Sequence, residues 1–195
     1  LKKGVNLNLT ISTRENSSTK RLGDFEFKNL EFKENAYDKK ILDKLNEYDY
    51  ILISVPPINS NDLFLKNLAN HVSESSKIKS ILYLSSTSVY GDHNGAWVNE
   101  ESETKPKTKM GIDRLHIENK WIEFSKKKKL PIQIFRLAGI YSEKNNAVSR
   151  LQNKQSFLVV KENHFFSRIH VKDISEILYL SLITVSYTHL RAHET

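Results

Sequence analysis

Hydroxyl side chains gather at one place in the sequence, directly after an apolar run. Residues 81–84 (Ile-Leu-Tyr-Leu) carry no charge and are followed by Ser85, Ser86, Thr87 and Ser88. An uncharged run of this kind is typical of a strand that is buried on both faces in a parallel sheet. The hydroxyls then lie at the carboxyl end of that strand, where open α/β sheets bind their ligands. This is the first place in the chain where we expect chemistry.

Two histidines near the end of the sequence have a spacing that suggests a metal site. His189 and His193 are four residues apart, as metal ligands on a helix are. They lie, however, in residues 185–195, which resemble the translation of a transposase-based sequencing adapter, and such segments are excluded from fold reasoning. We therefore predict no metal site, one domain over residues 1–184 and a non-native tail over residues 185–195. The absence of cysteine excludes a disulfide framework and thiolate chemistry.

The elements that must position the hydroxyls alternate between strands and helices. Apolar periodicity predicts strands at residues 4–11, 29–33, 50–55, 81–84, 131–137 and 157–160. It predicts helices at residues 38–48, 62–72, 111–127 and 173–182, and loops at residues 16–23 and 92–109. Such alternation indicates βαβ units and a parallel sheet, which is the α/β class. We expect Leu115, Ile122 and Trp121 to face inward, and Asp173 to cap the last helix.

The charge of the chain raises the question of a nucleic-acid partner. The net charge is +7, but the lysines are scattered, and the one dense run, residues 126–129, has no aromatic residue within it. We interpret that run as a solvated helix end that complements the helix dipole. No apolar run approaches about 18 residues, so no membrane span is expected. We predict neither a nucleic-acid nor a membrane partner, and a cytoplasmic location.

Three stretches of the sequence, the first of which contains the hydroxyl residues, are informative by their order and spacing. They are residues 84–92 (Leu-Ser-Ser-Thr-Ser-Val-Tyr-Gly-Asp), 134–141 (Ile-Phe-Arg-Leu-Ala-Gly-Ile-Tyr) and 167–174 (Ser-Arg-Ile-His-Val-Lys-Asp-Ile). Together they resemble the NAD(P)-dependent epimerase/dehydratase family, the extended and atypical branch of the short-chain dehydrogenases. The resemblance covers about residues 4–182 and implies a Rossmann-type, doubly wound parallel sheet of strand order 3-2-1-4-5-6-7.

The resemblance also implies a missing part. The family's first strand and its Gly-x-x-Gly-x-x-Gly turn, which seats the pyrophosphate, would precede Leu1. None of the six glycines in the chain forms that pattern. We therefore expect a truncated sheet in which the fold's second strand lacks one neighbour, and a chain that by itself binds a cofactor poorly.

The catalytic roles of the family can be carried over residue by residue. In the family, a Ser or Thr at the strand end hydrogen-bonds the substrate oxygen, while a Tyr and a Lys four residues later move the proton. Ser86 occupies the hydroxyl position with Thr87 beside it, whereas Met110 and Arg114 stand at the Tyr and Lys positions. Methionine cannot exchange a proton and arginine stays charged, so the resemblance predicts that the proton relay is absent.

Several side chains keep two interpretations. Arg114 is either a fixed donor to a cofactor ribose or a substrate phosphate, or a surface arginine near Asp113 or Glu118. Tyr90 and Tyr141 are either substitute acids or packed tyrosines.

The resemblance also indicates which residues would bind a cofactor and distinguish NADP from NAD. A basic residue after the second strand suits the 2′-phosphate of NADP, whereas an acidic one would suit NAD, so we predict NADP with NAD as the alternative. Two prolines follow the strand at 50–55 and match backbone that flanks the adenine and ribose, although they would also simply end a strand. The predicted cofactor-binding residues are Thr13, Arg14, Val55, Pro56, Pro57 and Ser85.

The resemblance implies an NAD(P)-binding protein that acts on a small polar metabolite, such as a nucleotide-linked sugar, and that forms a homodimer when full length. The alternative is a non-catalytic dinucleotide-binding regulator or scaffold. Met110 favours the alternative, whereas Ser86 favours the enzyme.

Overall fold

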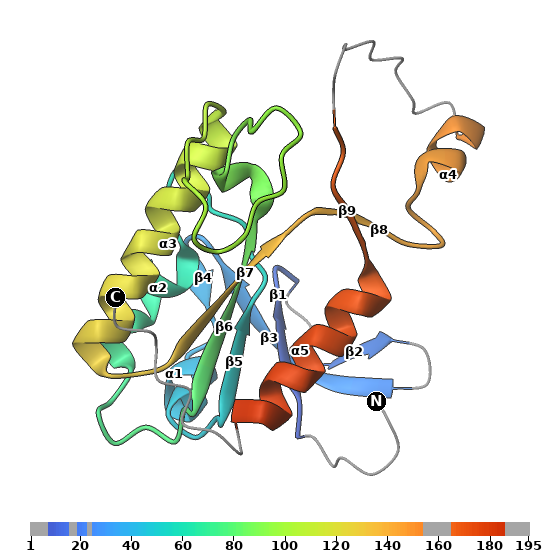
Figure 1. Ribbon diagram of the computed structural model, residues 1–195. Coiled ribbons are helices and arrows are strands. Elements are labelled where there is room, and N and C mark those ends of the chain that lie inside the picture. The colour runs from blue at the N-terminus through green and yellow to red at the C-terminus, as the bar shows by residue number, and fades with distance from the viewer. Residues whose placement is uncertain (1–7, 16–18, 23–24, 154–164, 186–195) are drawn as a thin grey trace.

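The computed structural model describes residues 8–15, 19–22, 25–153 and 165–185 (Figure 1). Its strands are β1 Thr10–Thr13, β2 Thr19–Leu22, β3 Phe25–Lys33, β4 Ala36–Tyr37, β5 Tyr50–Ile53, β6 Ser80–Ser86, β7 Ile132–Leu137, β8 Gly139–Tyr141 and β9 Arg168–His170. Its helices are α1 Lys40–Leu45, α2 Leu63–Asn67, α3 Lys109–Lys128, α4 Ala147–Gln152 and α5 Val171–Val185, with 3₁₀ turns η1 Ala69–His71 and η2 Thr87–Val89.

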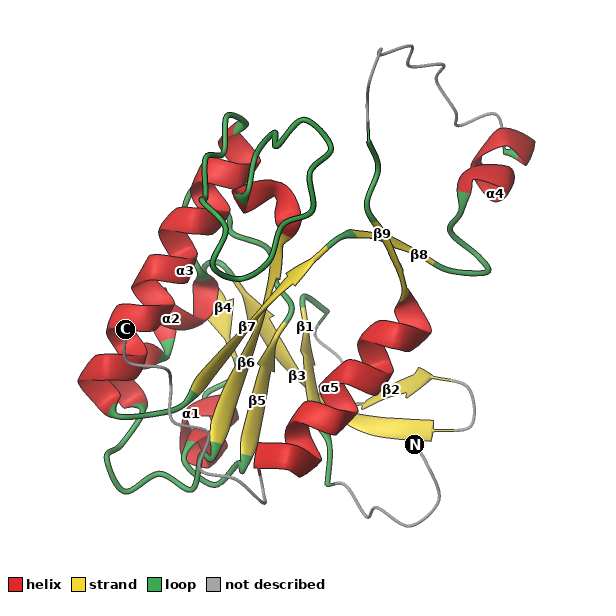
Figure 2. Cartoon of the chain, viewed as in Figure 1, coloured by secondary structure: helices red, strands yellow, loops and turns green. Residues whose placement is uncertain are grey.

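The strands form three hydrogen-bonded sheets. One has the order β1-β3-β2 with β4 paired to β3, the second has the order β5-β6-β7, and the third is the β8–β9 pair. The pairs β1–β3, β5–β6, β6–β7 and β8–β9 are parallel, whereas β2 and β4 run antiparallel to β3. Helices α1, α2 and α3 lie on one side of the β5–β6–β7 sheet and α5 lies on the other (Figure 2). The predicted doubly wound α/β fold is confirmed.

The break between the two larger sheets falls where the resemblance predicts it. Within the described residues β1 pairs with β3 alone and β5 pairs with β6 alone, so each is an edge strand. The fold's second strand therefore lacks a neighbour, as expected. On β5 the side chain of Leu52 is 50% exposed although the strand is apolar.

The core lies between the central strand and the helices on one side of it. Strand β6 buries Ile81, Leu82 and Tyr83 almost completely, as its uncharged sequence predicts. The ring of Trp121 on α3 packs against Tyr83 with 5.8 Å between centroids and against Phe64 on α2 with 5.4 Å. This packing fixes α3 against β6, and thereby places the helix that carries position 114 over the strand that carries the hydroxyls.

Some predicted bounds and faces are wrong. The loop expected at residues 16–23 contains β2, which pairs with β3. On α3 the inward face is Ile117, Trp121 and Phe124, whereas Ile122, expected inside, is 39% exposed. Positions 117, 121 and 124 follow the 3.6-residue period of a helix that begins at Lys109, and residue 122 falls outside that stripe.

Other predictions shift by a few residues. The strand expected at residues 4–11 is β1, which reaches Thr13, and residues 1–7 lie outside the described part. The helix expected at residues 38–48 is α1, which is shorter at both ends. Helix α5 begins at Val171, so Asp173 lies in its first turn instead of capping it. The strand expected at residues 157–160 also lies outside the described residues.

The ends of α3 follow from its sequence. Thr108 caps the helix, because its side chain accepts a hydrogen bond from the Gly111 N–H at 3.1 Å. Lysines 126–128 occupy the last turn, and Lys129 ends the helix in the left-handed conformation with φ 53°. This position at the helix end agrees with our interpretation of the lysine run. Among the helices of the described segments, none has the length and apolar character needed to cross a membrane.

Candidate ligand site

A cavity of about 230 Å³ lies at the carboxyl ends of β5, β6 and β7. The three strands are parallel, so their carboxyl ends meet at one edge of the sheet. The lining includes hydroxyls, one cation and apolar side chains, but no carboxylate. Its residues are Ser54, Leu84, Ser85, Ser86, Arg114, Leu137, Ala138 and Ile140.

The turn after β6 holds the hydroxyls in place. The Ser86 Oγ accepts a hydrogen bond from the Ser88 N–H at 3.2 Å and so caps η2. Gly91 follows with φ 72°, and a Cβ there would lie 2.2 Å from the Lys105 carbonyl oxygen. Only glycine fits such a turn without strain. Strand β6 therefore passes at Ser86 into the η2 turn, and Ser85 and Ser86 lie at the cavity wall.

The serines differ in what their hydroxyls already bind. Ser85 is 5% exposed, and no described group pairs with its Oγ. A buried hydroxyl without a partner is costly, so such a group commonly binds a ligand or a water molecule. Ser86 accepts from a backbone N–H, which leaves its own proton available to donate. Thr87 is half-buried in η2 and does not line the cavity.

Arg114 reaches from α3 onto the central strand. Its Nη1 donates to the Leu84 carbonyl oxygen at 2.9 Å and to the Tyr83 Oη at 3.3 Å. Our alternative of a surface arginine near Asp113 or Glu118 is therefore wrong. Asp113 accepts a hydrogen bond from Ser60, and Glu118 binds a different arginine. Arg114 is a half-buried cation in the cavity wall.

Neither Tyr83, which accepts a hydrogen bond from Arg114, nor Met110, one helix turn before Arg114, can transfer a proton near neutral pH. Burial raises the pKa of Tyr83 from 10.0 to about 12, so its phenol stays protonated. Met110 is 63% exposed and does not line the cavity. No proton relay is present at the two positions where the resemblance places it.

A buried ion pair behind the cavity was not predicted from the sequence. Arg136 on β7 donates from Nη2 and Nε to the Glu118 carboxylate on α3 at 2.9 and 3.2 Å, and Glu118 is 1% exposed. Burial opposes the charge of Arg136, but the hydrogen bonds that it donates to Glu118 and Tyr90 outweigh this effect and raise the pKa of the guanidinium. The two residues are 18 positions apart on different elements, so no local spacing in the sequence indicates this pair.

Tyr90 is a packed residue, as one of our two interpretations has it. Its ring is 7% exposed and lies 4.8 Å from the Arg136 guanidinium carbon, a cation–π arrangement.

The predicted cofactor residues do not all come together. Ser85 lines the cavity, whereas Thr13, Arg14 and the segment Val55–Pro57 do not. The Thr13 Oγ1 accepts from the Glu15 N–H at 3.2 Å, and Glu15 pairs with Lys20, while Arg14 is exposed. The segment 55–57 forms the loop directly after β5.

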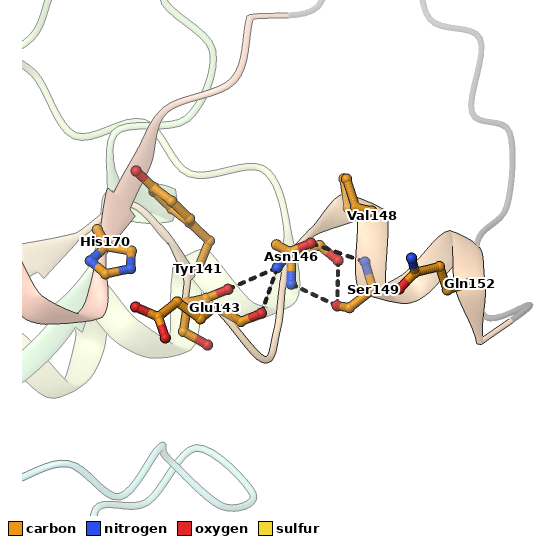
Figure 3. A pocket seen from close by; sticks show the side chains of 9 residues that line it. Tyr141, Glu143, Asn146, Val148, Ser149, Gln152 and His170 are labelled. Carbon is orange, nitrogen blue, oxygen red and sulfur yellow. Dashed lines mark hydrogen bonds between the residues drawn. The ribbon is translucent and has the colours of Figure 1, made fainter.

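A second, larger cavity of about 620 Å³ lies near α4, between the β8–β9 pair and the helix (Figure 3). The rings of Tyr141 and His170 meet edge to face with 4.9 Å between centroids. Asn146 caps α4 and forms a reciprocal capping box with Ser149. In the described parts of the chain no group of three His, Asp or Glu side chains could hold a metal ion.

The comparisons with known proteins agree with this arrangement. The sequence pattern of the NAD dependent epimerase/dehydratase family matches residues 57–186. No curated protein matches the sequence significantly. A solved structure described as a functionally unknown conserved protein from Silicibacter pomeroyi DSS is 35% identical, with a TM-score of 0.64 over 71% of this chain and 49% of that one.

Two enzymes of known reaction share the fold. UDP-N-acetylglucosamine 4-epimerase from Bacillus cereus is 21% identical, with a TM-score of 0.62 over 89% of this chain and 63% of that one. A UDP-glucuronic acid 4-epimerase variant from the same organism, solved with a sugar nucleotide and NAD, is 16% identical, with a TM-score of 0.63 over 80% of this chain and 56% of that one. The chain thus spans less than two thirds of each of these proteins. Since the family pattern matches most of the sequence, the chain belongs to the NAD dependent epimerase/dehydratase family.

Proposed function

We propose that this chain is part of a dinucleotide-binding protein that holds NADP and a small polar metabolite without the family's Tyr/Lys proton relay. The observation that carries the proposal is Arg114. A guanidinium bound to Leu84 O and Tyr83 Oη stands in the cavity wall where the family's proton-moving pair is expected. It can position a ligand, but it cannot accept or release a proton.

The described residues fit part of a dinucleotide. The hydroxyl of Ser85 would contact the nicotinamide end beside the cavity, and Thr13 and Arg14 would hold the adenosine end after β1. Bound there, the cofactor would supply hydride transfer at its nicotinamide ring. No glycine-rich pyrophosphate turn occurs among the described residues, so we expect the 195-residue chain alone to bind the cofactor more weakly than the full-length protein does.

The surroundings of Arg14 support NADP over NAD. Its only acidic sequence neighbour, Glu15, is already paired with Lys20. Arg14 is exposed, and none of the described residues pairs with it. An exposed guanidinium at the end of the second strand of this fold suits a 2′-phosphate. We expect Arg14→Gln to lower the affinity for NADP about tenfold or more and to leave the affinity for NAD nearly unchanged.

The second cavity supports a small polar metabolite as the other ligand. Gln152 lines it with an amide, and His170 and Tyr141 add ring faces, while Asn146 and Ser149 bind each other in the capping box and Glu143 pairs with Lys172. Such a lining suits a hydroxyl-rich ligand such as a nucleotide-linked sugar.

A second candidate function is turnover by a route that needs no tyrosine. Ser86 favours it, because its Oγ accepts from the Ser88 N–H and keeps a proton to donate to a substrate oxygen. Under this function, Ser86→Ala would abolish turnover but not dinucleotide binding.

Binding and turnover measured on one sample of full-length protein separate the two functions. Calorimetric titration with NADP and NAD gives the affinities, and absorbance at the NADPH band follows reduction in the presence of sugar nucleotides. We expect saturable NADP binding without reduction. Absence of binding to both dinucleotides would refute the proposal.

We also propose that residues 1–184 form one domain, that residues 185–195 are not part of it, and that the full-length protein is a cytoplasmic homodimer. Light scattering on full-length protein tests the dimer.

A further inference from the structure

We infer that the cavity between β5, β6, β7 and α3 binds an oxyanion, a carboxylate or phosphate group of a small ligand, on the guanidinium of Arg114 and the hydroxyls of Ser85 and Ser86. This inference concerns the same site as the proposed function and rests on it for the kind of ligand, but it assigns a ligand chemistry that the proposed function leaves open.

The first observation is an unneutralised cation. Arg114 is half-buried, and no carboxylate among the described residues lies within ion-pair distance of it. Both of its described hydrogen bonds, from Nη1 to Leu84 O and to Tyr83 Oη, go to uncharged acceptors. Withdrawing a guanidinium partly from water without a counter-charge is unfavourable, and an anion would offset that cost.

The second observation is that the nearby carboxylates are engaged elsewhere. Glu118 is bound by Arg136, and Asp113 accepts from Ser60. The Asp62 carboxylate accepts from the Trp121 Nε1 at 3.3 Å and from the Leu65 N–H at 2.9 Å. Each of these acids has its own hydrogen-bond partners. The charge of Arg114 is felt at Asp62, where it partly offsets the rise in pKa that burial causes, but no acidic group lies in the cavity lining beside the guanidinium.

The third observation is the orphaned hydroxyl. Ser85 is only 5% exposed and lines the cavity. Its Oγ has no hydrogen-bond partner among the described residues. Ser86 beside it has a proton to donate. Two hydroxyl donors and the Nε and Nη2 groups of a fixed guanidinium form a donor set that carboxylate and phosphate oxygens accept well.

The planar guanidinium explains why an arginine at this position suits an anion better than a proton relay. Nη1 is held by the strand, so the remaining nitrogens keep a fixed direction, and a fixed fork recognises planar or tetrahedral oxyanions with little loss of entropy on binding. A lysine would present one mobile ammonium instead.

The test uses two probes on full-length protein, inorganic phosphate and acetate, each titrated by calorimetry. Binding of phosphate alone assigns the site to a phosphate group, and binding of acetate alone or of both assigns it to a carboxylate-sized oxyanion. We expect Arg114→Gln to weaken binding about tenfold or more, Arg114→Lys to weaken it less, and Ser85→Ala to weaken it severalfold. Ser85→Ala breaks no described hydrogen bond, so this variant stays folded.

Arg14→Gln is the matched control, because it removes a cation at the other proposed phosphate position. If the phosphate affinity falls in Arg14→Gln and not in Arg114→Gln, the anion lies at the adenosine end and the inference is overturned. Unchanged affinity in both Arg114→Gln and Ser85→Ala overturns it as well. The affinity for NADP, measured separately, tests the proposed function. A negative result for the oxyanion site therefore does not decide the result for NADP binding, and the reverse also holds.

Discussion

At the scale of single residues, the chemistry of the cavity depends on two substitutions within one helix turn. Met110 and Arg114 stand where the family resemblance places a tyrosine and a lysine. Arg114 binds the central strand through Leu84 O and Tyr83 Oη, while Met110 faces solvent. We therefore propose that a fixed cation stands here in place of a proton-moving pair.

The phenol of Tyr83 gives a pH prediction. Its pKa is raised by burial from 10.0 to about 12 in the folded chain. Folding therefore favours the protonated phenol, and its contribution to stability is complete below about pH 10 and is lost as the pH rises towards 12. In Tyr83→Phe the free energy of unfolding should fall less steeply above pH 10 than in the wild type. Urea unfolding at pH 8 to 11 measures this, and parallel slopes for the two proteins would contradict it.

The buried ion pair gives a stability prediction. Arg136→Met leaves the Glu118 carboxylate, which is 1% exposed, without its cation. Removing one partner of a buried pair costs about 3–5 kcal/mol, and we expect the lower end because Arg136 itself is 22% exposed. The exposed pair Lys77–Glu47 is the control, and Lys77→Met should change the free energy of unfolding by less than about 1 kcal/mol. Similar losses in the two variants would contradict the account.

At the scale of elements, short helices depend on their caps. Asp62 caps α2 by accepting from the Leu65 N–H, and its second oxygen accepts from the buried Trp121 Nε1. One side chain thus joins α2 to α3. Its pKa is raised chiefly by burial, since the hydrogen bonds it accepts only partly offset the loss of water.

Asp62→Ala should destabilise the fold through both contacts. Loss of the cap costs about 1 kcal/mol, and a buried indole N–H without an acceptor costs about 1–3 kcal/mol more. Asp43→Ala is the matched control, because Asp43 lies exposed in the first turn of α1. Denaturant unfolding followed by tryptophan fluorescence measures both variants. A loss below about 1 kcal/mol in Asp62→Ala would show that the contact with Trp121 is not important.

The elements themselves were predictable where one pattern dominates. The apolar run of β6 and the hydroxyls after it predicted the cavity wall correctly. A strand that is buried on both faces is apolar throughout, and such a run is easily recognised in a sequence. The inward face of α3 was misjudged by one residue at Ile122, and β2 was missed because the polar sequence of residues 19–22 has no apolar alternation. Partners such as Glu118 and Arg136 are far apart in sequence, and only the packing of α3 on β7 brings them together.

At the scale of the whole molecule, the two larger sheets differ in how completely they are enclosed. β6 is paired on both sides and is buried, whereas β1 is an edge strand with half-buried and exposed side chains. Local opening costs least where few buried contacts and few ladder bonds must break.

Hydrogen exchange should reveal this gradient. We expect the amides of β6 to exchange slowest and those of β1 and β2 to exchange faster, by about tenfold or more. Mass spectrometry of peptides covering β6, β1 and β2 after deuterium labelling measures the difference. The amides of β7, an edge strand of the same sheet as β6, serve as the internal comparison. Uniform protection across both sheets would contradict the prediction.

We propose that this member of the family binds a dinucleotide but lacks the Tyr/Lys proton relay. The most direct measurement is the absorbance of NADPH formed when the full-length protein is mixed with NADP and a panel of sugar nucleotides, alongside a Met110→Tyr/Arg114→Lys double variant that restores the family pattern. We expect no reduction of NADP by the wild type while calorimetry shows NADP bound. Reduction of NADP by the wild type at a rate equal to or above that of the double variant would contradict it.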